Sequence, residues 1–174
     1  MASRQQDEDK DMEVRCSARV SAGRTPGERS LHSCTLHTVE GRRIVYLYGG
    51  RSKSGGTLDD LHVLDLDANV WSSPKIKGNK PAGRYGHSAV VHGESLFVFG
   101  GQSKVRASSD GSPPNPSLFV GDRMRADAET EVCAELHAYH ASTMEWKELN
   151  GEYKEFDSPS PRCKAASCLI PERH

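Results

Sequence analysis

The sequence predicts an all-β fold built from repeated four-stranded units. First, the segment at residues 26–50, PGERSLHSCTLHTVEGRRIVYLYGG, is matched by residues 81–101, PAGRYGHSAVVHGESLFVFGG. Second, LHVLDLDANVW at 61–71 is matched by LHAYHASTMEW at 136–146, so the two features follow in the same order twice. Third, the apolar runs are short, rich in β-branched or aromatic residues and separated by turn residues, and no segment has helical periodicity.

Each unit is expected to form an antiparallel meander. The strands expected in the first unit are 33–39, 43–48, 61–66 and 71–76. Those expected in the second are 87–91, 95–99, 134–139 and 146–149, with Gly93 and Glu94 forming the tight first hairpin.

Single strands are expected on both sides of these units. The repeat offset aligns Gly23 with Gly78 and Cys16 with Trp71, which places residues 13–21 where the fourth strand of a preceding unit would lie. A third copy begins near Arg162, so residues 163–170 are expected to form a lone first strand. In this copy Ala165 stands where the other two have His.

The order of features resembles the kelch repeat, whose units are the blades of a β-propeller. Each unit carries Arg-x-x-His-Ser, an apolar run ending in Gly-Gly, Leu-His, and then Trp. The resemblance implies an incomplete kelch-type β-propeller within residues 12–174, with four-stranded antiparallel blades at 29–76 and 84–149. Because propellers typically need four or more blades, no closed ring is expected from one chain.

The resemblance also implies that the repeated residues are structural. Each Gly-Gly pair is expected to end the second strand where crowding excludes a Cβ atom, and each Trp to fill the space between blades. We expect the repeat His residues to hydrogen-bond within their own blades, and His62 and His137 to face outward. The structural positions are Arg29, His32, Gly49, Gly50, Trp71, Arg84, His87, Gly100, Gly101, Trp146 and Arg162.

Three explanations are open for the shortage of blades. The chain is a truncated or alternatively spliced product, an excerpt of a longer chain, or a protomer that is completed by association. We favour truncation, and the exposed blade faces also suggest self-association.

Composition argues against several classes of function. The 174 residues carry 23 basic and 24 acidic side chains and a formal net charge of -1, which disfavours nucleic-acid and membrane partners. No apolar run is long enough to span a bilayer, and the charged first residues do not resemble a secretory signal. An intracellular location, cytoplasmic or nuclear, is therefore expected, with residues 1–11 forming a disordered acidic tail.

No catalytic, metal-binding or cofactor-binding residue is predicted. The 5 cysteines lack metal-ligand spacing, so reduced thiols are expected. The segment at residues 50–57 resembles a phosphate loop but lacks its Lys and a following helix. No nucleophile elbow is present.

The second unit differs from the first by an insertion. There are 34 residues between Gly101 and Leu136 but 10 between Gly50 and Leu61, so 24 extra residues lie at about 102–131. Either the insertion is a tolerated surface loop or it determines binding specificity. In the second case we expect a basic rim for an acidic peptide or protein, formed by Arg51, Lys53, Gln102, Lys104, Arg106, Arg123 and Arg125.

The leading hypothesis is a protein-interaction module that presents its blade loops to a protein or peptide partner. Such a module could belong to a substrate-recognition protein, as in ubiquitin ligases, or to a scaffold. The alternative is a fragment of a propeller-based metal-dependent enzyme or specifier protein, whose ligands the sequence does not place.

Overall fold

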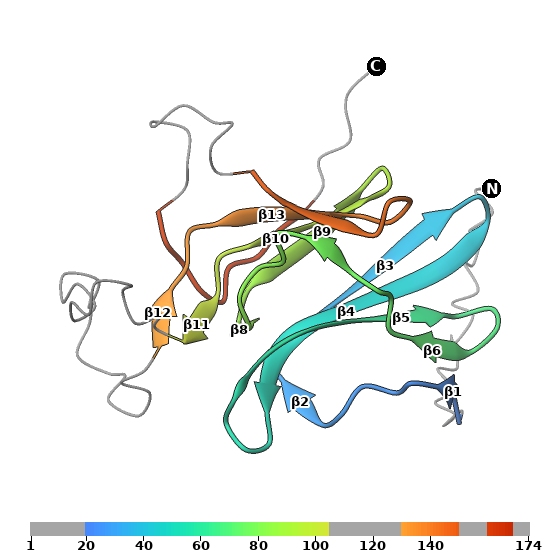
Figure 1. Ribbon diagram of the computed structural model, residues 1–174, viewed down its shortest axis with the longest axis horizontal. Helices are drawn as coiled ribbons and strands as arrows, with labels where there is room; N and C mark the ends of the chain where they lie inside the picture. The colour runs from blue at the N-terminus through green and yellow to red at the C-terminus, as the bar shows by residue number, and fades with distance from the viewer. Residues whose placement is uncertain (1–19, 105–129, 150–159, 169–174) are drawn as a thin grey trace, which may run out of the picture.

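The computed structural model describes residues 20–104, 130–149 and 160–168. All regular secondary structure in these residues is β. Two sheets lie face to face, and a small third sheet continues the second one at one end of its strands (Figure 1). The predicted all-β, open and incomplete propeller is confirmed. Residues 13–19 of the predicted fourth strand and residues 105–129 of the insertion lie outside the described residues.

The first blade is an antiparallel meander of four strands. These are β3 (Ser33–Val39), β4 (Arg42–Ser52), β5 (Thr57–Asp65) and β6 (Val70–Ser72). The β3–β4 turn places Glu40 and Gly41 at φ values of 49° and 77°, the left-handed conformation that two-residue hairpins favour. Two short strands extend the sheet: β1 (Ala22–Gly23) runs parallel to β6, and β2 (Arg29–Ser30) pairs with the far end of β4.

The second blade repeats this plan. Its strands are β9 (Ser88–His92), β10 (Ser95–Phe99), β13 (Leu136–His140) and β14 (Glu145–Glu148), and β7 (Lys77–Gly78) runs parallel to β14 as β1 does to β6. The third sheet consists of β8 (Arg84–Tyr85), β11 (Gln102–Lys104) and β12 (Thr130–Val132). It corresponds to the far end of the first blade, where β2 pairs with β4 and β4 with the start of β5.

Three expected strands differ most from the structure, and the strand expected at 61–66 also begins earlier, at Thr57. The strand expected at 71–76 ends at Ser72, ahead of Pro74, which has no N–H to donate to a ladder. The second strand of the first blade does not end at Gly50 but continues to Ser52, with a register shift between Tyr48 and Gly50.

The third difference concerns the start of the third repeat. Residues 163–168 form no strand, because among the described residues they meet the second blade only at isolated points. The Lys164 N–H donates to the Gly86 carbonyl at 2.6 Å, and the Ser167 hydroxyl donates to the Ala89 carbonyl at 3.2 Å. The segment runs where a first strand would lie, but it lacks the regular hydrogen bonds to a neighbouring strand that define a β-strand.

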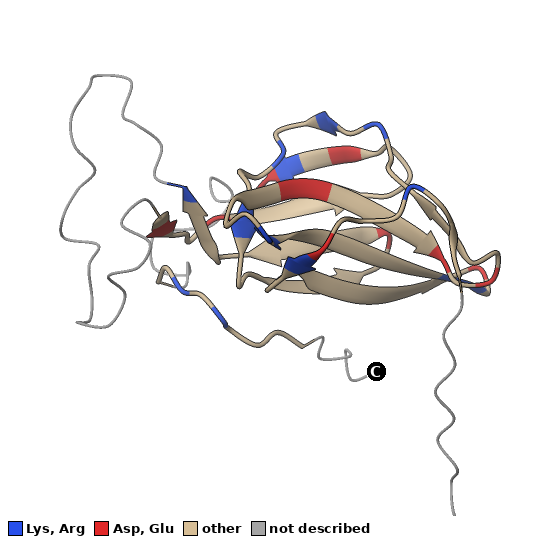
Figure 2. Ribbon diagram, turned by 90° about the horizontal axis from the view of Figure 1, so that it is seen from below, with Lys and Arg blue, Asp and Glu red and all other residues tan. Residues whose placement is uncertain are grey.

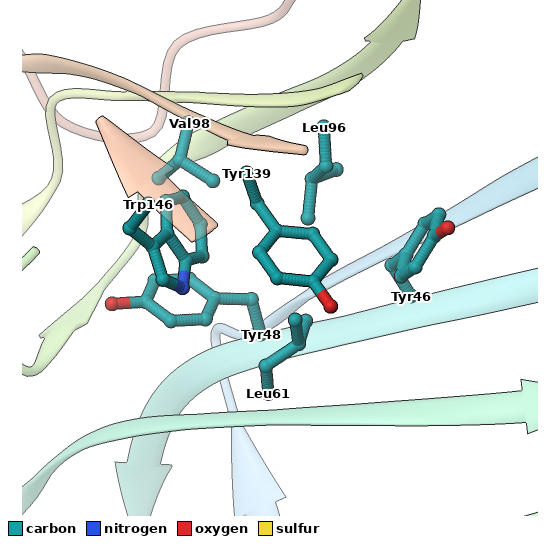
Figure 3. Close-up of a cluster of buried hydrophobic side chains, with 7 residues drawn as sticks. All are labelled: Tyr46, Tyr48, Leu61, Leu96, Val98, Tyr139 and Trp146. Carbon is teal, nitrogen blue, oxygen red and sulfur yellow. The ribbon is translucent and has the colours of Figure 1, made fainter. Parts of the chain in front are cut away.

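The hydrophobic core lies between the two blades (Figure 3). Alternate side chains of β4 and β5 point toward the second blade, and alternate side chains of its strands point back. The Tyr48 and Trp146 rings lie 5.1 Å apart, and Tyr46 meets the edge of Tyr139 at 6.1 Å. The buried cluster consists of Tyr46, Tyr48, Leu61, Leu96, Val98, Tyr139 and Trp146.

The two repeat tryptophans therefore have different surroundings. Trp146 is 1% exposed and fills the space between the blades. Trp71 lies on the opposite face of the first blade, where it is partly exposed and packs edge-on against His62 at 6.3 Å. Among the described residues, no second sheet covers that face.

We predict that Trp146→Ala lowers the free energy of unfolding by about 3–5 kcal/mol, since it opens a cavity in the shared core. Trp71→Ala is the matched control and should cost less than half as much, because its ring is already partly hydrated. Denaturant unfolding followed by circular dichroism measures both. Equal losses would contradict the position of the core between the blades.

Candidate functional site

In the first blade an arginine, an acid and a histidine form a closed triad. Arg29 donates from Nη1 to Asp60 Oδ1 at 2.6 Å and from Nη2 to Oδ2 at 2.9 Å, and His62 Nε2 lies 2.8 Å from Oδ2. Burial alone would raise the pKa of Asp60, but hydrogen bonds from Arg29 and His62 outweigh it and lower the pKa to about 2. Arg29 also donates to the Gly49 carbonyl at 3.1 Å, which joins the triad to the Gly-Gly pair.

The second blade has the same arginine and acid. Arg84 is 1% exposed and donates to Glu135 Oε2 at 2.9 Å, to the Gly100 carbonyl at 3.0 Å and to the Ala82 carbonyl at 3.1 Å. The sequence reasoning missed the acid in both blades. The signal was present, since Asp60 and Glu135 each stand directly before the repeated leucine.

The Gly-Gly pairs allow two close backbone approaches. A Cβ atom on Gly49 would lie 2.7 Å from the Arg84 carbonyl oxygen of the next blade. One on Gly50 would lie 2.8 Å from the Ser30 carbonyl oxygen of its own blade. In the same way, Gly100 lies against the Arg162 carbonyl oxygen of the third repeat, and Gly101 lies against the Tyr85 carbonyl oxygen of its own blade. All four glycines have φ values between 61° and 105°. The first glycine of each pair therefore leaves room for the backbone of the following repeat.

The third repeat docks on the second blade in the same way. The Arg162 carbonyl oxygen lies against Gly100 and accepts a hydrogen bond from the Gly101 N–H at 2.9 Å. Its exposed guanidinium donates to the Ser160 carbonyl at 3.0 Å, as Arg84 does to Ala82. The Lys164 N–H donates to the Gly86 carbonyl, just as the Gly86 N–H donates to the Leu31 carbonyl at 2.8 Å.

The histidines do not lie as the sequence suggested. His87 reaches Ser33 of the other blade, with Nε2 2.8 Å from its hydroxyl, so its hydrogen bond is between blades rather than within one. His32 is exposed. The expectation that His62 and His137 face outward was wrong, because both are buried beside the repeat arginine and acid.

The predicted basic rim is only partly described, and two of its described members, Arg51 and Lys53, contact other side chains. Arg51 lies over the Tyr85 ring at 5.6 Å, and Lys53 pairs with Glu28 at 3.2 Å. Lys104 is exposed at the end of β11. Gln102 lies in β11, which is paired on both sides, and is only 8% exposed, so it does not form part of an exposed rim.

Arg106, Arg123 and Arg125 of the predicted rim lie outside the described residues. In the described part, Lys and Arg alternate with Asp and Glu and do not gather on one edge (Figure 2). The basic rim therefore stays a prediction.

Loops from both blades nevertheless meet at one end of the structure. Gly83, in the linker between the blades, lies against Thr57 at the start of β5, and its carbonyl accepts a hydrogen bond from the Ser103 hydroxyl at 2.8 Å. We call this edge the loop end, formed by residues 53–57, 79–83, 102–104 and 130–133. The tight turns at residues 40–41 and 93–94 connect the strands at their other ends and form the hairpin end.

A polar cavity of about 270 Å³ opens at the loop end. Its walls come from the linker between the blades and from the ends of the second blade's strands. The lining residues are Asn79, Lys80, Pro81, Ala82, Arg84, Ser103, Glu131, Cys133, Glu135, His137 and Glu148. Most of these side chains are polar or charged, so the cavity offers a polar concave surface to a partner.

A second cavity, of about 250 Å³, lies on the far face of the second blade. Phe97, Phe99 and Leu136 line it, and Ala165 and Ala166 of the third repeat cover part of it. The three apolar residues correspond to the first-blade side chains that pack against the second blade. This cavity is therefore part of the face on which the third repeat packs.

The described residues show no metal cluster, and the cysteine that lines the polar cavity is buried. Within residues 20–104, 130–149 and 160–168, no group of three or more His, Cys, Asp and Glu side chains is placed to hold a metal ion. Burial raises the pKa of Cys133 to about 11, so its thiol is not a nucleophile at neutral pH. No helix in the same residues could cross a membrane.

Comparison with known proteins identifies relatives along most of the chain. Residues 11–174 match the family model described as the KLHDC2/KLHL20/DRC7 Kelch-repeats domain. Host cell factor 2 from Homo sapiens is 29% identical over 87% of this chain, and Kelch domain-containing protein 3 from Rattus norvegicus is 36% identical over 75%. Acyl-CoA-binding domain-containing protein 5 from Arabidopsis thaliana is 30% identical over 86%. The chain spans only 18%, 33% and 18% of these three proteins, respectively.

The buried histidines predict a pH-dependent stability. Burial and the Arg84 charge lower the pKa values of His87 and His137 to about 4, against an ordinary value of 6.5. The unfolded chain therefore binds more protons than the folded one between these values, and the free energy of unfolding falls as the pH drops through this window. We expect a loss of about 2 kcal/mol per histidine between pH 7 and about 4.5.

Urea unfolding at a series of pH values measures this loss. The exposed His92 supplies the control variant, His92→Gln, which should keep the same slope. A free energy of unfolding that stays constant across the window would show that neither buried histidine is held neutral.

Proposed function

The chain belongs to the kelch-repeat family of β-propeller proteins, and we propose that it binds a partner protein or peptide through its loop end. Kelch-repeat domains act as protein-interaction modules. Binding through the loop end is our extension of that general role to this chain.

One observation carries the proposal: the repeated polar residues serve the fold, whereas the loop end is where the two blades differ. The arginines and acids of the repeats bond to each other and to the glycine carbonyls. The hairpin end consists of short turns in both blades. At the loop end, by contrast, the second blade carries its 24 extra residues, and loops from both blades meet around the polar cavity.

Rigid blades favour such a role. The shared aromatic core and the hydrogen bonds between blades fix the strand ends from which the loops start. Loops on a rigid scaffold can change in sequence without disturbing the core, and they lose little conformational freedom on binding. Substrate recognition for a ubiquitin ligase and scaffolding are special cases of this role, and the identity of the partner would decide between them.

We predict that the loop-end variant Arg51→Glu/Lys53→Glu/Lys104→Glu weakens partner capture at least tenfold. These three exposed or partly exposed cations lie on loops and strand ends of both blades. The measurement is affinity capture with quantitative mass spectrometry, followed by binding assays with each purified partner.

The control is the hairpin-end variant Glu40→Lys/Glu94→Lys, which reverses exposed charges at the other end. It should capture partners as the unmodified chain does, and both variants should unfold at the same denaturant concentration as that chain. Capture that survives the loop-end changes but is lost in the control variant would place the binding surface at the hairpin end and contradict the proposal.

A further inference from the structure

The two blades differ at one equivalent histidine. In the first blade both ring nitrogens of His62 have partners: Nδ1 lies 3.3 Å from the Arg24 carbonyl, and Nε2 lies 2.8 Å from Asp60. His137 occupies the same repeat position, is 5% exposed and lines the polar cavity. In the part of the chain that the structure describes, its Nδ1 has no hydrogen-bond partner. The contact that His62 Nδ1 makes with the Arg24 carbonyl thus has no counterpart at His137.

The acid beside the histidine also differs between the blades. Glu135 replaces the aspartate of the first blade, and its longer side chain directs a carboxylate oxygen to Arg84 at 2.9 Å. The backbone around the histidine is unchanged, since the Asn79 N–H donates to the Trp146 carbonyl at 3.0 Å as Arg24 does to Trp71 at 3.1 Å. A buried polar atom without a partner loses its hydrogen bonds to water without replacement, so a bound group that supplied a partner would recover part of that free energy.

The charges around the cavity favour a cation. Three carboxylates line it, from Glu131, Glu135 and Glu148. Both of its cations are already paired: Lys80 with Asp59, which does not line the cavity, at 2.6 Å, and Arg84 with Glu135, one of the three carboxylates, at 2.9 Å. Among the described residues no cation pairs with Glu131.

The hydrogen-bonding chemistry points the same way. Ionised carboxylates only accept hydrogen bonds, and a neutral imidazole has one accepting nitrogen, whereas lysine and arginine side chains only donate. Burial and the Arg84 charge lower the pKa of His137 to about 4, so the ring is neutral at pH 7 and does not repel a cation. A metal ion fits less well, because no group of three potential ligands is assembled in the described residues.

We propose that the polar cavity binds a lysine or arginine side chain of a partner protein, with Glu131 as its ion-pair partner and His137 as a hydrogen-bonding group on the inner wall. This inference rests on the proposed function and names a partner chemistry for it. It differs from the acidic partner that the predicted basic rim would select, so the loop end would recognise both signs of charge at separate places.

The test is an NMR titration of the full chain with blocked single amino acids. The probes are the N-acetyl N′-methylamides of lysine and arginine. The corresponding norleucine compound matches lysine without its charge, and the glutamate compound carries the opposite charge. Lysine and arginine should shift the His137 ring signals saturably, with a dissociation constant in about the millimolar range expected for so small a ligand.

Glu131→Gln should weaken this binding at least fivefold, because it removes the ion-pair partner and keeps the shape of the side chain. Glu94→Gln, a change of the same type at the hairpin end, should leave it unaltered. Equal shifts with norleucine, no saturation with either cation, or unchanged binding in Glu131→Gln would overturn the cation site.

These outcomes separate the two proposals. Partner capture that is lost in the loop-end variant, together with no lysine or arginine binding, would keep the binding module and remove the cation site. Saturable lysine binding, together with capture that neither the loop-end variant nor Glu131→Gln reduces, would keep the cavity's chemistry and contradict the proposed function.

Discussion

The contact on which the rest of the structure depends is the approach of each repeat's arginine carbonyl to the first glycine of the preceding Gly-Gly pair. Arg84 makes this contact with Gly49, and Arg162 makes it with Gly100. A Cβ atom at either glycine would collide with the arginine carbonyl oxygen and push the next repeat away. The positive φ values of these glycines would also strain any other residue. The arginine side chain then bonds to the glycine carbonyl of its own blade and to the acid before the repeated leucine. One residue therefore sets both the blade's own fold and its distance from its neighbour.

Most of the fold could be predicted because the repeat carries it. Strands 33–39 and 95–99 have the predicted bounds, since each is delimited by turn residues and has strand-forming composition. The errors arose where pairing rather than local sequence decides. β4 continues past its glycines because β2 and β5 pair with it on both sides, and residues 163–168 form no strand because they lack such partners among the described residues.

Less of the candidate site could be predicted, since side-chain positions there depend on contacts between blades. Gln102 was placed on a surface rim, but strands on both sides bury it. His62 and His137 were expected outside, but the repeat arginine and acid hold this position in the interior. The equivalence of His62 and His137 is visible in the sequence, but the unpartnered Nδ1 of His137 appears only when the two blades are compared in space.

The repeated residues thus serve the fold, and we propose that the loop end serves binding. Hydrogen–deuterium exchange of the chain with and without a purified partner tests this division most directly. If partners bind at the loop end, exchange should be slower in the bound state at residues 53–57, 79–83, 102–104 and 130–133. Exchange at the turns 40–41 and 93–94 should be unchanged. Protection confined to those turns, or to the sheet faces away from the loop end, would contradict this division.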